Sequence, residues 1–279
     1  MASSREAGAE EAAAYAAPGL EALARFGYVS KGVIYGVIGV LALSVVLGWG
    51  GVAADTQGAL LRLQDLPLGT PLLWLLALGL LGYALWQLIR AFLDPEHQGR
   101  GARGLAKRAG YLLSALANSG LALFAVRLAW TGHARRDEHR EVEVARQVLD
   151  WPGGQVLLAL AGLVLLAVAG SAFYSASGAR FMKRMALTEL GTRSAELVKR
   201  VGQVGIAARG VVLAIIAVFL LLAAWRGRAG SVRGIAEVFS WLRAQPAGPL
   251  LLGVVALGTL CYGWWCLIQA RYRRVRVQP

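Results

Sequence analysis

The sequence predicts an all-α integral membrane protein with six transmembrane helices, arranged as three parallel two-helix repeats. Of its 279 residues, 57% are hydrophobic and 16% are charged, which is too apolar for a soluble domain of this size. Six apolar segments of about 20 residues are each long enough to cross about 30 Å of hydrocarbon as a helix. A stretch that starts at Gly27, GYVSKGVIYGVIGVL, returns at Gly205 as GIAARGVVLAIIAVF and more faintly at Gly110 as GYLLSALANSGLALF.

The chain begins with residues 1–26, which are rich in Ala and Glu. We expect a cytoplasmic tail that is disordered at first and ends in a short surface helix. Carboxylates ahead of the first apolar segment, with no cleavage site after it, argue against a cleaved signal peptide. The six spans are then expected at residues 28–48, 70–92, 110–130, 154–174, 205–225 and 248–268.

The repeat unit is longer than one span. About 40 residues after each leading glycine comes a Pro-x-Gly sequence, and the residues before each proline are apolar at helical spacing. That pattern is typical of a short helix in the membrane interface, ended by a proline that cannot continue its hydrogen bonds. The predicted units are 27–92, 110–174 and 205–268; basic connections at 93–109 and 175–204 separate them, and a basic tail at 269–279 follows.

Because each unit has two spans, all three copies face the same way across the membrane. A pseudo-threefold bundle is the natural arrangement, and a row of hairpins is the alternative. The second spans of units one and three match in register, whereas unit two has Val164, Val168 and Ser171 at the first three matched positions and is therefore the divergent copy. The matched pairs are Gly79 and Gly258, Tyr83 and Tyr262, Trp86 and Trp265, and Ala91 and Ala270.

The basic residues predict the orientation. Lys and Arg total 29 against 16 Asp and Glu, and they flank apolar spans, so membrane lipids rather than nucleic acid are the expected partners. About 16 of them lie in the two termini and in the second and fourth connections, against about 9 in the other three. The positive-inside bias therefore places both termini in the cytoplasm.

Reactive groups are missing from the predicted spans, which contain no Asp or Glu, and His97, His133 and His139 all fall in connections. This disfavours proton-driven transport, haem ligation and intramembrane hydrolysis. We expect no cofactor, no metal site and no enzymatic activity. The densest polar cluster, His133, Glu138, His139 and Glu141, is interpreted as a solvated helix face rather than a metal site.

Two sets of polar residues remain as candidates. Lys31 and Arg209 occupy equivalent places in units one and three, where unit two has Ser114, and Arg90 closes the second span. These three cations could contact an anion or a lipid headgroup, although snorkelling of long side chains to the interface is the favoured interpretation. In the third span, Asn118 and Ser119 are interpreted as an interhelical polar contact rather than a solute-lining position.

The GYxxKG and GxxxRG openings, the repeated Pro-x-Gly, the GLLGYALW sequence of the second span and the ending Ala270-Arg271-Tyr272-Arg273 resemble the DUF1206 family of bacterial integral membrane proteins. The resemblance covers residues 20–275. It implies six spans in three repeats and a bacterial plasma (inner) membrane. Since the family has no known function, the resemblance implies no site residue.

The favoured function is that of a non-enzymatic scaffold or partner subunit, associated with lipid and with other membrane proteins. The alternative is an anion or small-solute channel or carrier, in which Asn118, Lys31 and Arg209 would line the path. A membrane enzyme that uses loop residues is the third hypothesis. The radius and polarity of the bundle interior separate the first two, because a channel needs a continuous polar path.

Overall fold

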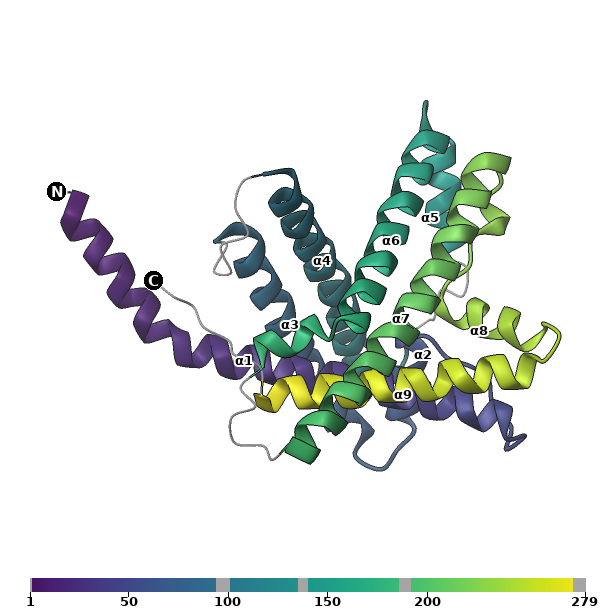
Figure 1. The fold of residues 1–279 in the computed structure, drawn as a ribbon, viewed down its shortest axis with the longest axis horizontal. Helices are drawn as coiled ribbons and strands as arrows, with labels where there is room; N and C mark the ends of the chain where they lie inside the picture. Colours follow the sequence, from purple (N-terminus) through teal and green to yellow (C-terminus); the bar gives the residue numbers. More distant parts are fainter. Residues whose placement is uncertain (1, 94–100, 135–139, 186–191, 273–279) are drawn as a thin grey trace.

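The structure is a computed structural model that describes residues 2–93, 101–134, 140–185 and 192–272. Five of the six predicted spans lie within a helix that is long and apolar enough to cross a membrane, and the first, predicted at 28–48, matches such a helix that ends two residues earlier, at Val46. These spans confirm the all-helical multi-pass architecture. The long helices, shown in Figure 1, are α1 (Ala2–Val46), α3 (Gly69–Phe92), α4 (Ala102–Thr131), α6 (Gly154–Ser177), α7 (Thr192–Arg226) and α9 (Gly248–Tyr272).

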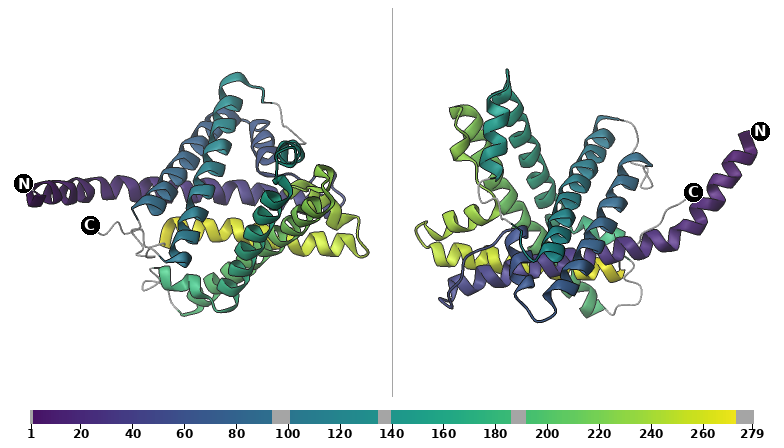
Figure 2. Two further views of the ribbon diagram at one scale, coloured as in Figure 1. Left: turned by 90° about the horizontal axis from the view of Figure 1, so that it is seen from above. Right: turned by 180° about the vertical axis from the view of Figure 1, so that it is seen from behind.

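The start of the chain differs from the prediction of a disordered tail and a separate surface helix. Helix α1 begins at Ala2 and runs without a break into the first span, and its N-terminal part projects away from the other helices (Figures 1 and 2). The two basic connections are also partly helical, because α4 and α7 begin before the predicted spans and a short 3-10 helix, η1 (Arg180–Arg184), follows α6. A second short 3-10 helix, η2 (Ala229–Ser231), follows α7.

The short helix predicted before each Pro-x-Gly is present in all three repeats, as α2 (Thr56–Gln64), α5 (Arg140–Leu149) and α8 (Ile235–Arg243). The Asp55 side chain caps α2 by accepting a hydrogen bond from the backbone N–H of Gly58 at 2.7 Å, as an N-cap residue does. Helices α2 and α8 bury their apolar sides in the bundle, with Leu60 and Phe239 almost inaccessible.

The Pro-x-Gly sequence forms the same turn three times. Its middle residue has a left-handed backbone in each repeat, with φ of 69° at Leu68, 79° at Gly153 and 60° at Ala247. The backbone N–H of the final glycine then donates to the carbonyl three residues earlier, at 2.8 to 2.9 Å, as in a turn with proline at its second position. A Cβ on that glycine would overlap a carbonyl oxygen of the preceding short helix, so the motif needs glycine there.

The six long helices form a ring rather than a row of hairpins. Extensive contacts join α3 to α4, α6 to α7, and α9 to α1. Each of these pairs combines the second helix of one repeat with the first helix of the next, and the α9–α1 pair returns from the last repeat to the first. Seen from above, the three pairs form a triangle (Figure 2). The pseudo-threefold arrangement predicted from the repeats is therefore the one observed.

Contacts within a repeat are uneven. The two long helices pack together in repeat one (α1 and α3) and in repeat three (α7 and α9), whereas over the described residues α4 and α6 of repeat two lack comparable packing. The surroundings of the three leading glycines show the same difference. A Cβ at Gly27 would lie 2.5 Å from Cβ of Tyr83, and one at Gly205 would lie 2.5 Å from N of Tyr262, but one at Gly110 would meet nothing within 4 Å. The ring is thus loosest between α4 and α6.

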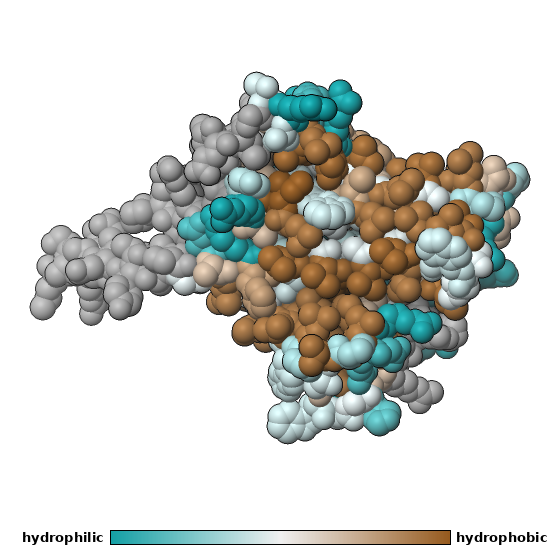
Figure 3. Space-filling view, turned by 90° about the horizontal axis from the view of Figure 1, so that it is seen from below, coloured by the Kyte–Doolittle hydropathy of each residue, from teal (hydrophilic) through white to brown (hydrophobic). Residues whose placement is uncertain are grey.

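Apolar side chains fill the bundle and also cover it. Ile34, Ile38, Leu73, Leu80 and Phe239 are each at most 1% exposed and belong to one continuous core. The outer surface carries many exposed leucines, valines and tryptophans, and Figure 3 shows a broad hydrophobic face with hydrophilic residues gathered at its margin. This surface suits hydrocarbon.

Candidate functional site

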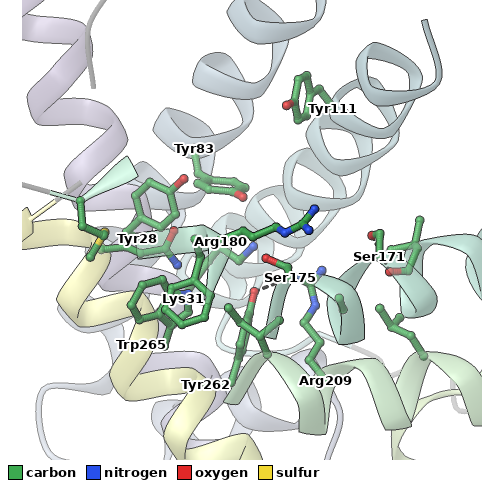
Figure 4. A pocket seen from close by; sticks show the side chains of 17 residues that line it. Tyr28, Lys31, Tyr83, Tyr111, Ser171, Ser175, Arg180, Arg209, Tyr262 and Trp265 are labelled. Carbon is green, nitrogen blue, oxygen red and sulfur yellow. Dashed lines mark hydrogen bonds between the residues drawn. The ribbon is translucent and has the colours of Figure 1, made fainter. Parts of the chain in front are cut away.

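A cavity of about 450 Å³ lies where the three repeats meet. It is lined near the first residues of the spans in α1, α4 and α7 and near the last residues of α3, α6 and α9, the ends predicted to be cytoplasmic. All six long helices and η1 contribute to its wall (Figure 4). Its polar lining consists of three cations, four tyrosines, two serines and an amide: Lys31, Arg180, Arg209, Tyr28, Tyr83, Tyr111, Tyr262, Ser171, Ser175 and Gln269.

The cavity is built from equivalent positions of the three repeats. The residue after each leading glycine lines it, as Tyr28, Tyr111 and Ile206. So does the sixteenth residue after each proline, which is Tyr83 in repeat one, Val168 in repeat two and Tyr262 in repeat three. A site assembled in this way lies at the centre of the ring and requires all three repeats.

Lys31 and Arg209 each stack on the matched tyrosine of their own repeat. The Lys31 Nζ lies 4.2 Å from the ring centroid of Tyr83, and the Arg209 Cζ lies 5.1 Å from that of Tyr262. Arg209 also donates from Nη1 to the Tyr262 hydroxyl oxygen at 2.6 Å. Aromatic rings stabilise a cation removed from water, so the tyrosines hold these cations in the bundle.

Repeat two contributes its cation differently. It has Ser114 where the other repeats have Lys31 and Arg209, and Val168 where they have tyrosine. The third positive charge comes instead from Arg180 in η1, directly after α6. Its guanidinium carbon lies 3.7 Å from the ring centroid of Tyr174, and Figure 4 shows the ends of Lys31, Arg180 and Arg209 gathered around one space.

The cavity is strongly positive. Among the residues that the structure describes, no Asp or Glu lines it, so three formal positive charges share one partly open space without a carboxylate in its wall. The Lys31 side chain is only 7% exposed, whereas Arg180 and Arg209 remain exposed and present guanidinium donors to the cavity. Like charges in a partly desolvated site attract an anion, and tyrosine and serine hydroxyls can add donors to it.

Arg90 does not line the cavity but supports it. Its side chain is 5% exposed, and it donates at 2.8 Å both to the side-chain carbonyl of Gln87 and to the Tyr111 hydroxyl. Its guanidinium carbon also lies 3.8 Å from the Tyr111 ring centroid. Arg90 therefore fixes the α4 tyrosine of the cavity wall. Snorkelling, the favoured interpretation for Lys31 and Arg90, is wrong, because both side chains are buried within the bundle.

The hydrogen bonds that the structure gives for Asn118 lie within its own helix, so the expected interhelical contact stays a prediction. The Asn118 amide nitrogen donates to the Ser114 backbone carbonyl at 2.6 Å and approaches the Ser114 hydroxyl at 3.4 Å, both within α4. Asn118 and the half-buried Ser119 are absent from the cavity wall. A polar side chain in a helix can bond to the carbonyl one turn back, and that local partner satisfies the amide without a second helix.

The polar cluster in the third connection is only partly described. Glu138 and His139 lie outside the described residues, His133 follows α4, and Glu141 belongs to α5. Within the described part of the chain, no group of three His, Cys, Asp or Glu side chains is arranged to hold a metal ion.

Sequence reasoning found two of the three cations and missed the rest of the site. No pattern in the sequence marks Arg180 as a site residue. It occupies no repeated position and is only one of several basic residues in the connection at 175–204. The tyrosines did have a signal. Tyr83 and Tyr262 recur in register in the same two repeats that carry Lys31 and Arg209, and this joint recurrence could have paired each cation with its ring.

Comparison with known proteins agrees with the repeat structure. The family model described as Domain of Unknown Function (DUF1206) matches three times, at residues 26–94, 109–178 and 204–273. The chain is 31% identical over 258 residues to the "Uncharacterized protein YxxB" of Bacillus subtilis (strain 168), which covers 92% of this chain and 93% of that protein. No solved structure matches the chain. With three family matches that follow its three repeats, the chain belongs to the DUF1206 family.

Proposed function

We propose that this membrane protein binds an anionic ligand, without chemical conversion, in the tyrosine-lined cavity at the centre of its helix ring. The observation that carries the proposal is the convergence of Lys31, Arg180 and Arg209 on one cavity whose described wall has no carboxylate. A volume of about 450 Å³ falls within the range of small-ligand sites. The proposed role is non-enzymatic, in line with the expectation from the sequence, and adds the binding of an anion to it.

The packing beyond the cavity argues against an open channel. On the far side of Arg209, a cavity of only about 70 Å³ is lined by Ile235 and Phe239 of α8, and Ile235 separates it from a mostly apolar cavity of about 730 Å³. Apolar side chains of the core, including Ile34 and Ile38, fill the bundle around it. Among the described residues there is thus no polar path through the bundle that passes Asn118. The narrowing from a cavity of about 450 Å³ to one of about 70 Å³ beyond Arg209 suits a binding protein better than an open channel.

The small cavity favours an anion carrier as the second candidate function. Arg209, Leu213 and Tyr262 line both cavities. An anion held at Arg209 would therefore be adjacent to the small cavity beside α8. A movement of α8 would open that space to the opposite side of the membrane, as alternating access requires. Anion flux into proteoliposomes that contain the purified protein tests this candidate, and binding without flux would contradict it.

Equilibrium dialysis of the purified protein against labelled inorganic phosphate, at low ionic strength, tests the binding proposal. A hydrogen bond to a charged group contributes about 1.5–3 kcal/mol, so Lys31→Gln, Arg180→Gln and Arg209→Gln should each weaken binding by about tenfold or more. Arg62→Gln is the matched control, because Arg62 lies on α2, outside the cavity wall, with its side chain 55% exposed. Equal phosphate binding by all four variants would overturn the proposal.

A further inference from the structure

The divergence of repeat two leaves a lateral opening beside the cavity. In repeats one and three, small residues face each other across the two long helices. A Cβ at Gly79 would overlap Ser30, and a Cβ at Gly258 would overlap Ala208. The equivalent residues of repeat two are Leu113 and Val164, which are bulky and are 58% and 50% exposed. These two side chains explain why α4 and α6 do not pack as the other pairs do.

The opening is continuous with the basic cavity. Tyr111 of α4 and Val168 and Ser171 of α6 line the cavity, and Val168 is still 41% exposed. It lies one helical turn from Val164, which lines a mostly apolar cavity of about 730 Å³ bordered by α5, α6 and α7, so the basic cavity is followed along α6 by apolar space. Figure 1 shows the α3–α4 and α6–α7 pairs diverging from each other as they leave the α1–α9 pair. We call the space between α4 and α6, bordered by Leu113, Val164 and Val168, the repeat-two seam.

We propose that the ligand of the cavity is an anionic amphiphile from the bilayer, with its acidic headgroup at Lys31, Arg180 and Arg209 and its acyl chain in the repeat-two seam. This inference rests on the anion-binding function proposed above and names the class of ligand. The cavity alone accommodates a headgroup, whereas the chains of a lipid need an apolar path that begins at the cavity. The seam provides that path, because the exposed Leu113 and Val164 follow the polar lining without an intervening charged residue.

The position of the cations fits a lipid that stays in its leaflet. The cavity occupies one half of the six spans, from the level of Tyr28 and Tyr111 inward to Tyr83 and Tyr262, and Val164 lies near the middle of α6. Basic residues at this level attract anionic lipid. The acidic headgroup thus lies against the cations near the membrane surface, and the acyl chain lies against apolar residues deeper in the bilayer.

Native mass spectrometry of the full-length protein in an uncharged detergent tests the inference, with dioleoyl phosphatidylglycerol, dioleoyl phosphatidylcholine and inorganic phosphate as probes. The wild-type protein should bind phosphatidylglycerol at least tenfold more tightly than phosphatidylcholine. The double variant Leu113→Ser/Val164→Gly copies the small pair of repeat one and should close the seam. It should weaken phosphatidylglycerol binding about tenfold while phosphate binding stays within twofold of wild type.

The control is Leu116→Ser/Leu166→Gly, which introduces the same two residues at exposed leucines of the same helices outside the cavity wall and should leave both affinities unchanged. Unchanged phosphatidylglycerol binding by the seam variant, or equal binding of the two lipids, would overturn the inference and leave the anion site intact. Failure of the wild-type protein to bind phosphate or phosphatidylglycerol would overturn the proposed function as well.

A photo-crosslinking measurement on the unmutated protein removes any dependence on the folding of variants. Phosphatidylglycerol that carries a diazirine in its acyl chain is incorporated with the protein into nanodiscs, irradiated and mapped by peptide mass spectrometry. In the presence of excess unlabelled phosphatidylglycerol, the crosslinks that disappear should be those to peptides containing Leu113 and Val164. Competable crosslinks confined to α1 or α9 would contradict the seam as the chain site.

Discussion

Replacing each leading glycine with alanine tests the open arrangement of repeat two. A Cβ at Gly205 would lie 2.5 Å and 2.6 Å from the backbone N and Cα of Tyr262, which cannot rotate away. A Cβ at Gly27 would lie 2.5 Å from the Tyr83 Cβ and 2.8 Å from the Gly79 carbonyl oxygen. At Gly110, in contrast, the new methyl group would enter open space.

The expected changes in the free energy of unfolding follow from two opposing effects. Alanine is favoured over glycine in a helix interior by about 1 kcal/mol, whereas inserting a methyl group into a close-packed interface costs about 1–3 kcal/mol; at a backbone contact of 2.5 Å the helices must also move apart. Gly27→Ala and Gly205→Ala should therefore lower the free energy of unfolding by about 1–2 kcal/mol. Gly110→Ala should leave it unchanged or raise it by up to about 1 kcal/mol.

Unfolding in mixed detergent micelles, with SDS as the denaturant and far-UV circular dichroism as the signal, measures these differences. Gly170→Ala on α6 is the control, because a Cβ there also meets nothing within 4 Å. If Gly110→Ala destabilises the protein as much as Gly205→Ala does, then α4 and α6 pack as closely as the other two pairs. The seam and the ligand proposed for it would then both be refuted.

Three further predictions concern the turns and the cavity wall, and unfolding in the same micelles measures them all. At the middle of the Pro-x-Gly turn, a left-handed backbone costs a residue other than glycine about 1–2 kcal/mol, so Ala247→Gly should stabilise the protein by about 1 kcal/mol and Gly153→Ala should destabilise it by a similar amount. Gly248→Ala should cost about 1–3 kcal/mol, since its Cβ would overlap the carbonyl oxygen of Arg243; no change would mean that the turn is looser than described. Tyr111→Phe removes the hydroxyl that accepts from the buried Arg90 and should cost about 1–3 kcal/mol, while Tyr174→Phe, at a ring that is 59% exposed, should change stability little.

The sequence was sufficient to predict the fold, because the features that specify it are local and repeated. Span length, the proline that ends each short helix and the glycine that follows it are visible in the printed order of residues. The closure of the ring was harder to predict. It depends on contacts between α1 and α9, which lie at opposite ends of the chain, and no local pattern reports the distance between them.

The site was predicted only in part, for a related reason. Lys31 and Arg209 were found because repetition marks them, but the burial of Lys31 was misjudged. Distance from the span boundary measures depth in the membrane, not whether a side chain turns toward lipid or toward the bundle. Tyr83 and Tyr262 decide that direction by stacking on the cations, and they come from the other helix of each repeat. Arg180 was missed because it belongs to no repeated position.

The loss of threefold symmetry in repeat two has two effects that act together. Leu113 and Val164 hold α4 and α6 apart, and the neighbouring positions Ser114 and Val168 remove the cation and the tyrosine that the other repeats contribute. A symmetric ring would present three equivalent cations to a ligand and close all three sides of the cavity. Here Arg180 replaces the missing charge from beyond the end of α6, and the third side stays open. A ligand in this site therefore has one direction along which an apolar chain can leave, which gives a bound amphiphile a single orientation.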